Sequence, residues 1–430
     1  MVKRTKILLA VLLMLAVVLA GCSSSTSSTS DGSGKIVLKF LHKWPEPQNH
    51  PYFDQVVKDF EKLHPNIVIQ TDAIADGPIK DKLRVILGVN DVPDIFFSWS
   101  GEFARKFVRA GAALDLTTYL NKDNAWKNSF IPSSLQPFQT DGKNYGIPID
   151  LDAKFFVYNK SIFSKYNLQE PKTWDEFIQE LNTLKQNGVT PIIFGNQDPW
   201  AAIHYLTGLN QKLVPEDVRM KDYNPQSGEF TDPGYVQALQ KFVDLNKNGY
   251  FMKNANSTSH DMAKQLFFAG KGAMFYLELV EFPDVEKAMK GNWGFFPMPA
   301  ITDGKGDQSM ITGAPDGFLV SSKTKHPKEA IEFLKFLTSK EEASKLTTQL
   351  GWPSPVKGAT TPQNAVKQVA EGVNDLNKAN GMAIWLDTDV NAKVADSYLS
   401  NAQLLLDGTK TPKQVIEEVK NVAKQVQSEN

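Results

Sequence analysis

Residues 36–69 read IVLKFLHKWPEPQNHPYFDQVVKDFEKLHPNIVI, which is an apolar strand, an amphipathic helix and a second apolar strand in that order. The run 36–41 is apolar except for Lys39, as is typical of a buried strand. The helix is predicted from apolar residues that recur at steps of three and four, namely Phe53, Val56, Val57, Phe60 and Leu63. His64 and Pro65 end it, and residues 67–69 form the next predicted strand.

The same alternation continues along the chain. A helix is expected at about 78–87 and a strand at 93–97, and further strands are expected at 155–158, 191–194, 273–276 and 317–320. Thr173 and Glu176 form the capping box of another helix, and later helices are expected at 235–246, 328–338 and 412–427. Alternating strands and helices predict an α/β protein with a mainly parallel sheet covered by helices on both faces.

The folded part of the 430-residue chain, from Lys35 onward, is too long for one ordinary hydrophobic core, so two lobes are expected. The sequence has no internal repeat and no long linker. We therefore expect the lobes to share strands that cross between them.

The composition is that of an ordinary globular protein, with 41% hydrophobic and 22% charged residues and a net charge of −1. Lys and Arg are interspersed with Asp and Glu, which argues against nucleic acid as a partner. The six histidines are scattered and the chain has one cysteine, so neither a metal site nor a cofactor is expected.

The first residues have the pattern of an export signal. Lys3, Arg4 and Lys6 precede an apolar run, 7–20, that is too short to span a bilayer. The following Cys22 is the only cysteine, and 19–22 (LAGC) resembles the lipobox of bacterial lipoproteins. We expect a signal peptide at 1–21, lipidation of Cys22 and a Ser-rich tether at 22–34, with no disulfide within the chain.

Seven further segments, in the same order along the chain, resemble those of extracellular solute-binding proteins of the carbohydrate uptake class, the group with the maltose-binding and raffinose-type proteins. The segments are 60–69, 92–96, 145–148 with 158–160, 172–177, 268–274, 292–299 and 330–334. The resemblance covers the chain from Met1 to the C-terminal helix.

This resemblance implies a two-lobed fold like that of periplasmic binding proteins, with a sugar in a central cleft that closes by a hinge motion. It places the crossings near 149–153, 275–278 and 321–325. The first lobe would then comprise 35–149 and 278–322, and the second lobe 150–277 and 323–430. No catalysis is implied.

A sugar site needs aromatic faces for the C–H groups of the ring and planar polar groups for its hydroxyls. Ligands of doubly wound folds lie beyond the carboxyl ends of strands. Loops after predicted strands supply His42, Trp44, Glu46, Trp99, Glu102, Asn196, Asp198 and Trp200. A predicted crossing and two turns supply Asp152, Asp316 and Trp352, and the resemblance adds Tyr276, Glu278, Trp385 and Asp387.

Each of these candidates also has a structural interpretation, because Asp often caps helices and Trp often packs in cores. Three other tryptophans are interpreted as structural: Trp174 at a helix start, Trp293 in a strand and Trp126 in a polar surface stretch.

The resemblance implies a permease with an ATPase as partner, attachment to the outer face of the bacterial membrane through Cys22, and a monomer. Two other classes stay open at this point. A glycoside hydrolase would need two carboxylates at a fixed separation, and a polysaccharide-docking adhesin would need a flat aromatic surface. The motifs G-x-S-x-G, G-x-x-x-x-G-K-[ST] and H-E-x-x-H are absent from the sequence, which argues against an enzyme.

Overall fold

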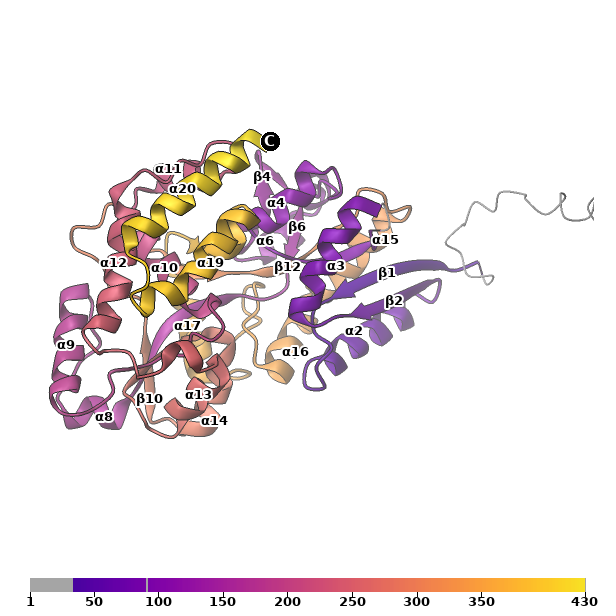
Figure 1. Ribbon diagram of the computed structural model, residues 1–430. Coiled ribbons are helices and arrows are strands. Elements are labelled where there is room, and N and C mark those ends of the chain that lie inside the picture. Colours follow the sequence, from indigo (N-terminus) through magenta and orange to yellow (C-terminus); the bar gives the residue numbers. More distant parts are fainter. Residues whose placement is uncertain (1–33, 90–91, 430) are drawn as a thin grey trace, which may run out of the picture.

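The chain folds into two lobes, each built around its own sheet (Figure 1). This computed structural model describes residues 34–89 and 92–429. The predicted signal peptide, Cys22 and nearly all of the predicted tether lie outside the described residues. Within the described part, none of the helices has the length and apolar character needed to cross a membrane.

The first lobe contains a five-stranded sheet in the order β2, β1, β3, β12, β6. Its strands are β1 (Ile36–His42), β2 (Ile67–Ala73), β3 (Ile95–Trp99), β6 (Gly146–Pro148) and β12 (Asp316–Val320). β1 is parallel to β2 and β3, whereas β12 is antiparallel to β3 and β6. The strand, helix and strand predicted from residues 36–69 are confirmed.

Helices α2 (His50–Leu63) and α15 (Pro327–Leu337) pack together in the first lobe. The buried ring of Phe60 on α2 lies 5.1 Å from the ring of Phe333 on α15, near edge to face. Other elements of this lobe are α3 (Asp76–Val89), α4 (Glu102–Arg109), α5 (Thr117–Lys122), α6 (Asn124–Ser129), α7 (Pro132–Leu135), η1 (Gln136–Phe138), β4 (Gln139–Thr140), β5 (Lys143–Asn144) and α16 (Lys340–Leu350).

The second lobe contains a six-stranded sheet in the order β13, β11, β7, β9, β8, with β10 also paired to β7. Its strands are β7 (Asp152–Asn159), β8 (Ile192–Ile193), β9 (Met274–Glu278), β10 (Trp293–Phe296), β11 (Ile311–Ala314) and β13 (Met382–Ala383). β7 runs antiparallel to β9, β10 and β11. Both sheets are therefore mixed, and the expectation of a mainly parallel sheet is wrong. Two of the antiparallel pairs, β6 with β12 and β7 with β11, arise because these strands pass between the lobes in opposite directions.

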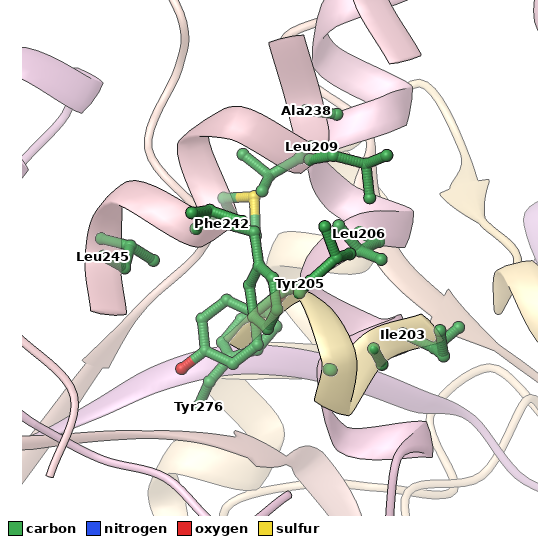
Figure 2. Packing of buried hydrophobic residues seen from close by; sticks show 14 of the residues in the cluster. Ile203, Tyr205, Leu206, Leu209, Ala238, Phe242, Leu245 and Tyr276 are labelled. Carbon is green, nitrogen blue, oxygen red and sulfur yellow. The ribbon is translucent and has the colours of Figure 1, made fainter. Parts of the chain in front are cut away.

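The core of the second lobe surrounds α10 (Trp200–Leu213), whose residues are buried except the first. Figure 2 shows Tyr205, Leu206 and Leu209 of this helix among Ala238, Phe242 and Leu245 of α12 (Pro233–Lys247), with Tyr276 nearby. The remaining helices are α8 (Lys160–Lys165), α9 (Trp174–Gln186), α11 (Glu216–Tyr223), η2 (Ala255–Ser257), α13 (His260–Phe268), η3 (Leu279–Glu281), α14 (Phe282–Met289), α17 (Lys367–Lys378), α18 (Leu386–Asp389), α19 (Ala392–Leu406) and α20 (Pro412–Glu429). The predicted capping box at Thr173 and Glu176 is confirmed.

Two of the crossings between the lobes are paired with each other. The chain leaves the first sheet after β6 and enters β7, and it returns from β11 to β12. Across this ribbon Pro148 pairs with Gly317, and Ala153 pairs with Gly313. The amide of Ile149 donates to the carbonyl of Asp316 at 2.8 Å. A further crossing runs from α16 to α17 and is joined to the ribbon where the Leu151 amide donates to the Pro353 carbonyl at 2.8 Å.

The crossing expected at 149–153 is thus confirmed, but the other two expected positions are wrong. Residues 275–278 lie inside β9, between β7 and β8 of the second sheet. Residues 321–325 stay with the first lobe, where the Ser321 amide donates to the Asp94 carbonyl.

The expected division of the chain into lobes changes accordingly. Most of the segment 278–322 belongs to the second lobe, because β10 and β11 pair there, and only β12 joins the first sheet. Conversely, α15 and α16 pack in the core of the first lobe although 323–430 was assigned to the second. Trp126 is also buried, with its indole N–H donating to Thr338 Oγ1 at 2.9 Å, so its expected place in a surface stretch is wrong.

Phe60→Ala should lower the free energy of unfolding by about 3 to 5 kcal/mol, because it opens a cavity between α2 and α15. Urea unfolding followed by circular dichroism measures the loss. Leu63→Ala is the matched control: it lies on the same helix but is 66% exposed, so a change within about 0.5 kcal/mol is expected. Equal losses for the two variants would contradict this packing.

Candidate ligand-binding cleft

A cavity of about 350 Å³ lies between the lobes. Its walls combine indole rings and carboxylates from both lobes with the ammonium groups of two lysines from the first lobe. The lining residues are Lys43, Trp44, Lys80, Trp99, Asp150, Asp152, Trp200, His204, Glu278, Val280, Ala314, Asp316, Trp352, Trp385, Asp387 and Thr388.

The strand directions explain why these side chains meet. β1 and β3 are parallel, so the residues after His42 and those around Trp99 lie at the same edge of the first sheet. β8 is parallel to β9 and β11 to β13, which brings Trp200, Glu278 and the residues after β13 to the facing edge of the second sheet. The cleft therefore lies beyond the carboxyl ends of parallel strands in both sheets, as in other doubly wound folds.

Most of the predicted site residues line this cavity. They are Trp44, Trp99, Asp152, Trp200, Glu278, Asp316, Trp352, Trp385 and Asp387. Trp44, Trp99 and Trp385 are nevertheless buried, whereas Trp200 and Trp352 are partly exposed.

Three predicted residues of the first lobe do not reach the cavity. His42 is buried below it, where its ring stacks on Phe53 at 4.5 Å between centroids. Glu46 lies four residues before α2, where its carboxylate accepts from the side chain of Asn49 at 3.5 Å. Glu102 is buried in ion pairs with two arginines of its own helix, Arg105 and Arg109.

Three predicted residues of the second lobe also lie outside the cavity lining. Asn196 is buried, and its amide donates to Asn256 Oδ1 at 2.8 Å. Asp198 is exposed on the surface just before α10. Tyr276 points into the core, with its ring 4.6 Å from Phe156 and 4.8 Å from Tyr205 (Figure 2).

Several lining residues were not among the predicted set: Lys43, Lys80, Asp150, His204, Val280, Ala314 and Thr388. Six of them lie near predicted residues in the sequence. Lys43 and Thr388 adjoin predicted residues, Asp150, Val280 and Ala314 lie two positions from one, and His204 lies one helical turn after Trp200. Lys80 had no such signal, since a lysine on an amphipathic helix is usually a solvated surface residue.

Aromatic rings line both sides of the cleft. In the first lobe, Trp44 stacks on Phe53 with ring centroids 4.9 Å apart and contacts Trp352 at 5.2 Å. In the second lobe, Trp385 stacks on His204 at 4.1 Å, and Trp200 lies next to His204 at 5.1 Å. Each of these indoles contacts a second ring, which restricts its orientation.

Lysines compensate the carboxylates of the cleft. Lys43 Nζ lies 2.5 Å from Asp316 Oδ2 and 5.1 Å from the centroid of Trp99. Lys154, with a side chain only 1% exposed, places Nζ 3.7 Å from Glu278 Oε1 and 5.1 Å from the centroid of Trp200. These cations also lie within cation–π distance of the indoles.

A polar network behind the cavity positions Glu278. Glu281 accepts from the Glu278 amide at 3.0 Å and contacts His260 Nε2 at 2.9 Å and Lys264 Nζ at 3.2 Å. Burial opposes ionisation of Glu281, but His260 and Lys154 outweigh it and hold the pKa of that carboxyl below its usual value. Glu281 therefore stays ionised and keeps the Glu278 backbone in place.

Two carboxyls at the crossing ribbon have raised pKa values. Burial, followed by the nearby Asp316, raises the pKa of Asp150 to about 7, and Lys43 partly opposes this. Burial and Glu278 raise the pKa of Asp152 well above its usual value. Burial lowers the pKa of His204, so its imidazole is neutral at pH 7.

The cleft thus offers hydrogen-bond acceptors between apolar ring faces. Such a site suits a ligand with several hydroxyl donors and apolar C–H faces. In the part of the chain that the structure covers, no group of His, Cys, Asp or Glu could hold a metal ion.

Comparison with known proteins identifies similar chains along most of the sequence. A family described as bacterial extracellular solute-binding protein matches residues 44–344. The multiple sugar-binding protein of Streptococcus mutans is 27% identical over 427 residues, covering 93% of this chain and 95% of that protein. An uncharacterised ABC transporter extracellular-binding protein of Pyrococcus horikoshii is 29% identical over 364 residues, covering 79% of each. The solved structure of a chitin oligosaccharide binding protein has a TM-score of 0.80 at 26% identity, covering 92% of this chain and 99% of that chain.

Asp150→Asn should stabilise the protein at pH 8 and change little at pH 4. The folded state binds the Asp150 proton more tightly than the unfolded chain does, whose pKa is 3.8. The stability associated with this proton is therefore complete below about pH 4 and is lost as the pH rises to about 7. Asparagine keeps the oxygen that accepts from the Asp316 amide at 3.0 Å and does not ionise.

Thermal unfolding between pH 4 and 8 measures this difference. The gap in melting temperature between Asp150→Asn and the wild type is expected to widen up to about pH 7 and then level off. Asp198→Asn, at an exposed position, serves as the control and should show no such trend. A gap that stays constant with pH would show that Asp150 titrates like an exposed carboxyl.

Proposed function

Because the chain belongs to the bacterial extracellular solute-binding protein family, in which it is the substrate-binding component of a sugar ABC importer, we propose that its interlobe cleft captures an oligosaccharide. Proteins of this family bind a solute and do not convert it, so the hydrolase alternative is set aside. The proposed ligand is a neutral chain of sugar rings, and the cleft residues are its proposed contacts.

One observation carries this proposal: tryptophans from both lobes line a single cavity together with carboxylates from both lobes. Indole faces can cover the C–H faces of pyranose rings, and carboxylates accept hydrogen bonds from the hydroxyls at the ring edges. More than one platform is available, Trp44 and Trp352 on one side and Trp200 and Trp385 on the other, which supports a ligand longer than one ring.

Glu278 is the proposed central acceptor for sugar hydroxyls. Lys154 and His204 lie 3.7 Å and 3.4 Å from its Oε1, and its backbone is held by Glu281. A hydroxyl that reaches Glu278 would therefore meet an acceptor whose position is already fixed, so little ordering is needed on binding.

The names of similar proteins support a saccharide ligand. One relative is a multiple sugar-binding protein and one solved structure is a chitin oligosaccharide binding protein. Linkage and ring type differ among such sugars, whereas all of them offer the apolar faces and hydroxyls that this cleft can contact.

We further propose that the cleft closes on the sugar by rotation about the crossing segments and that the closed form delivers it to the permease. The protein would act as a monomer on the outer face of the membrane, anchored by lipid on Cys22. Two or more acyl chains on that residue would give stable attachment.

Calorimetric titration with a panel of oligosaccharides tests the proposed function. The panel contains xylo-, arabino-, galacto-, α-gluco- and chito-oligosaccharides of two to five rings. At least one should bind with a dissociation constant of about 10 μM or below, equivalent to about −7 kcal/mol. The absence of binding by every sugar, with a folded protein, would contradict the proposal.

Trp200→Ala should weaken binding of the best panel sugar by about 1 to 3 kcal/mol, or roughly tenfold to a hundredfold, because a platform is lost. Its partial exposure at the start of α10 means that the fold should tolerate the change. Asp198→Ala, two residues earlier and outside the cavity, is the matched control and should bind like the wild type. An unchanged affinity for Trp200→Ala would exclude this ring as a sugar contact.

A further inference from the structure

An ion pair joins the two lobes next to the cleft. Arg105 lies on α4 of the first lobe, and Asp389 ends α18 of the second lobe. The guanidinium Nη2 donates to Asp389 Oδ1 at 2.7 Å and to the Asp389 carbonyl at 3.1 Å. Neither residue lines the cavity. Their contact therefore joins the two lobes and does not involve a ligand in the cavity.

The pair is well screened from solvent, and its arginine is held by a carboxylate of its own helix. The Asp389 side chain is 6% exposed and that of Arg105 is 24% exposed. Glu102 Oε2 accepts from Arg105 Nε at 3.3 Å and from Arg109 Nη1 at 2.9 Å. Glu102 therefore orients Arg105 across the gap, and this explains why a residue predicted to bind sugar is buried in ion pairs instead.

The backbones of the two lobes also approach closely at this point. Gly101, just before α4, has φ +73°, a conformation that favours glycine. A Cβ at this position would lie 2.8 Å from Asp389 Oδ1 and 3.1 Å from Ile384 Cγ2, closer than normal contact. The glycine thus allows α4 to come within hydrogen-bonding distance of α18.

The ion pair and the cavity share one short element of the second lobe. Trp385, Asp387 and Thr388 line the cavity, and Asp389 is the next residue. The amides of Thr388 and Asp389 both donate to the Trp385 carbonyl at 2.9 Å, so these residues form one turn. A ligand that orders this turn also places the Asp389 carboxylate for Arg105.

We propose that Arg105 and Asp389 form an interlobe latch, which closes with the cleft and slows release of the bound sugar although neither residue touches it. Arg105 and Asp389 are thus positioning residues for ligand retention. This inference rests on the proposed function for its ligand, but the latch itself is a property of the two lobes.

The physical basis is a shift in population between open and closed forms. A contact present only in the closed form raises the closed fraction, and the apparent affinity rises with that fraction. Opening would separate a charged pair that is mostly buried, and breaking such pairs acts mainly on the dissociation rate.

The first test compares Arg105→Gln and Asp389→Asn with the wild type. Each is expected to raise the dissociation rate of the best panel oligosaccharide about tenfold, with little change in the association rate, as followed by stopped-flow tryptophan fluorescence. Arg109→Gln is the matched control, because it removes a partner of Glu102 without an interlobe contact, and it should change the rate by less than about twofold. The double variant Arg105→Gln/Asp389→Asn should release sugar no faster than the faster single variant, because the two residues act as one unit.

A second test needs no sugar. Small-angle scattering of the ligand-free protein should give a larger radius of gyration for Arg105→Gln than for the wild type or Arg109→Gln. Unchanged dissociation rates, single-variant effects that multiply in the double variant, or equal radii for all three proteins would overturn the latch. If the wild type binds no panel sugar but the radii still differ as expected, the sugar proposal fails and the latch stands.

Discussion

The structure depends on a ribbon of paired strands that passes between the two sheets. β6 continues into β7 and β11 into β12, and the two strands stay hydrogen-bonded on both sides of the crossing. A Cβ on Gly313 would lie 2.3 Å from the Asp152 carbonyl, so the close approach of these strands requires glycine. The ribbon makes both sheets mixed. The ribbon also places Asp150, Asp152 and Asp316 where the lobes meet, because these residues are part of the ribbon itself.

That placement has an electrostatic consequence. Carboxylates at the junction of two lobes are screened from water, and each must be compensated or become protonated. Lys43 pairs with Asp316 and Lys154 lies next to Glu278, whereas burial raises the pKa of Asp150. The cleft therefore combines carboxylates that are paired with lysines and indole rings that are stacked on other rings. A hinge motion about the ribbon would leave these pairs intact and change only contacts between the lobes, such as that between Arg105 and Asp389.

The sequence predicted those site residues that lie at the outer end of a strand. It could not predict which side chains near a strand end are buried below the cavity. His42 ends β1 and Trp44 lies two residues further on, yet only Trp44 reaches the cavity, because His42 is completely buried beneath it. Glu278 and Tyr276 repeat this relation on β9. Proximity in sequence to a strand end therefore identified the correct edge of each sheet. The alternation of side chains along a strand does not show which of two residues on the same face reaches the cavity and which is buried below it.

By itself the sequence determined the α/β class, the positions of most helices and strands, and the gathering of tryptophans and carboxylates at strand ends, because local periodicity reflects burial on one face. Only the tertiary structure decided which sheet receives each strand. An apolar run such as 293–296 can be buried in either lobe, and the amphipathic helix at 327–337 could cover either sheet. The tertiary structure also decided the place of Lys80 in the cavity wall and the contact of Arg105 with the facing lobe. Arg105 and Asp389 are 284 positions apart, and no local pattern links them.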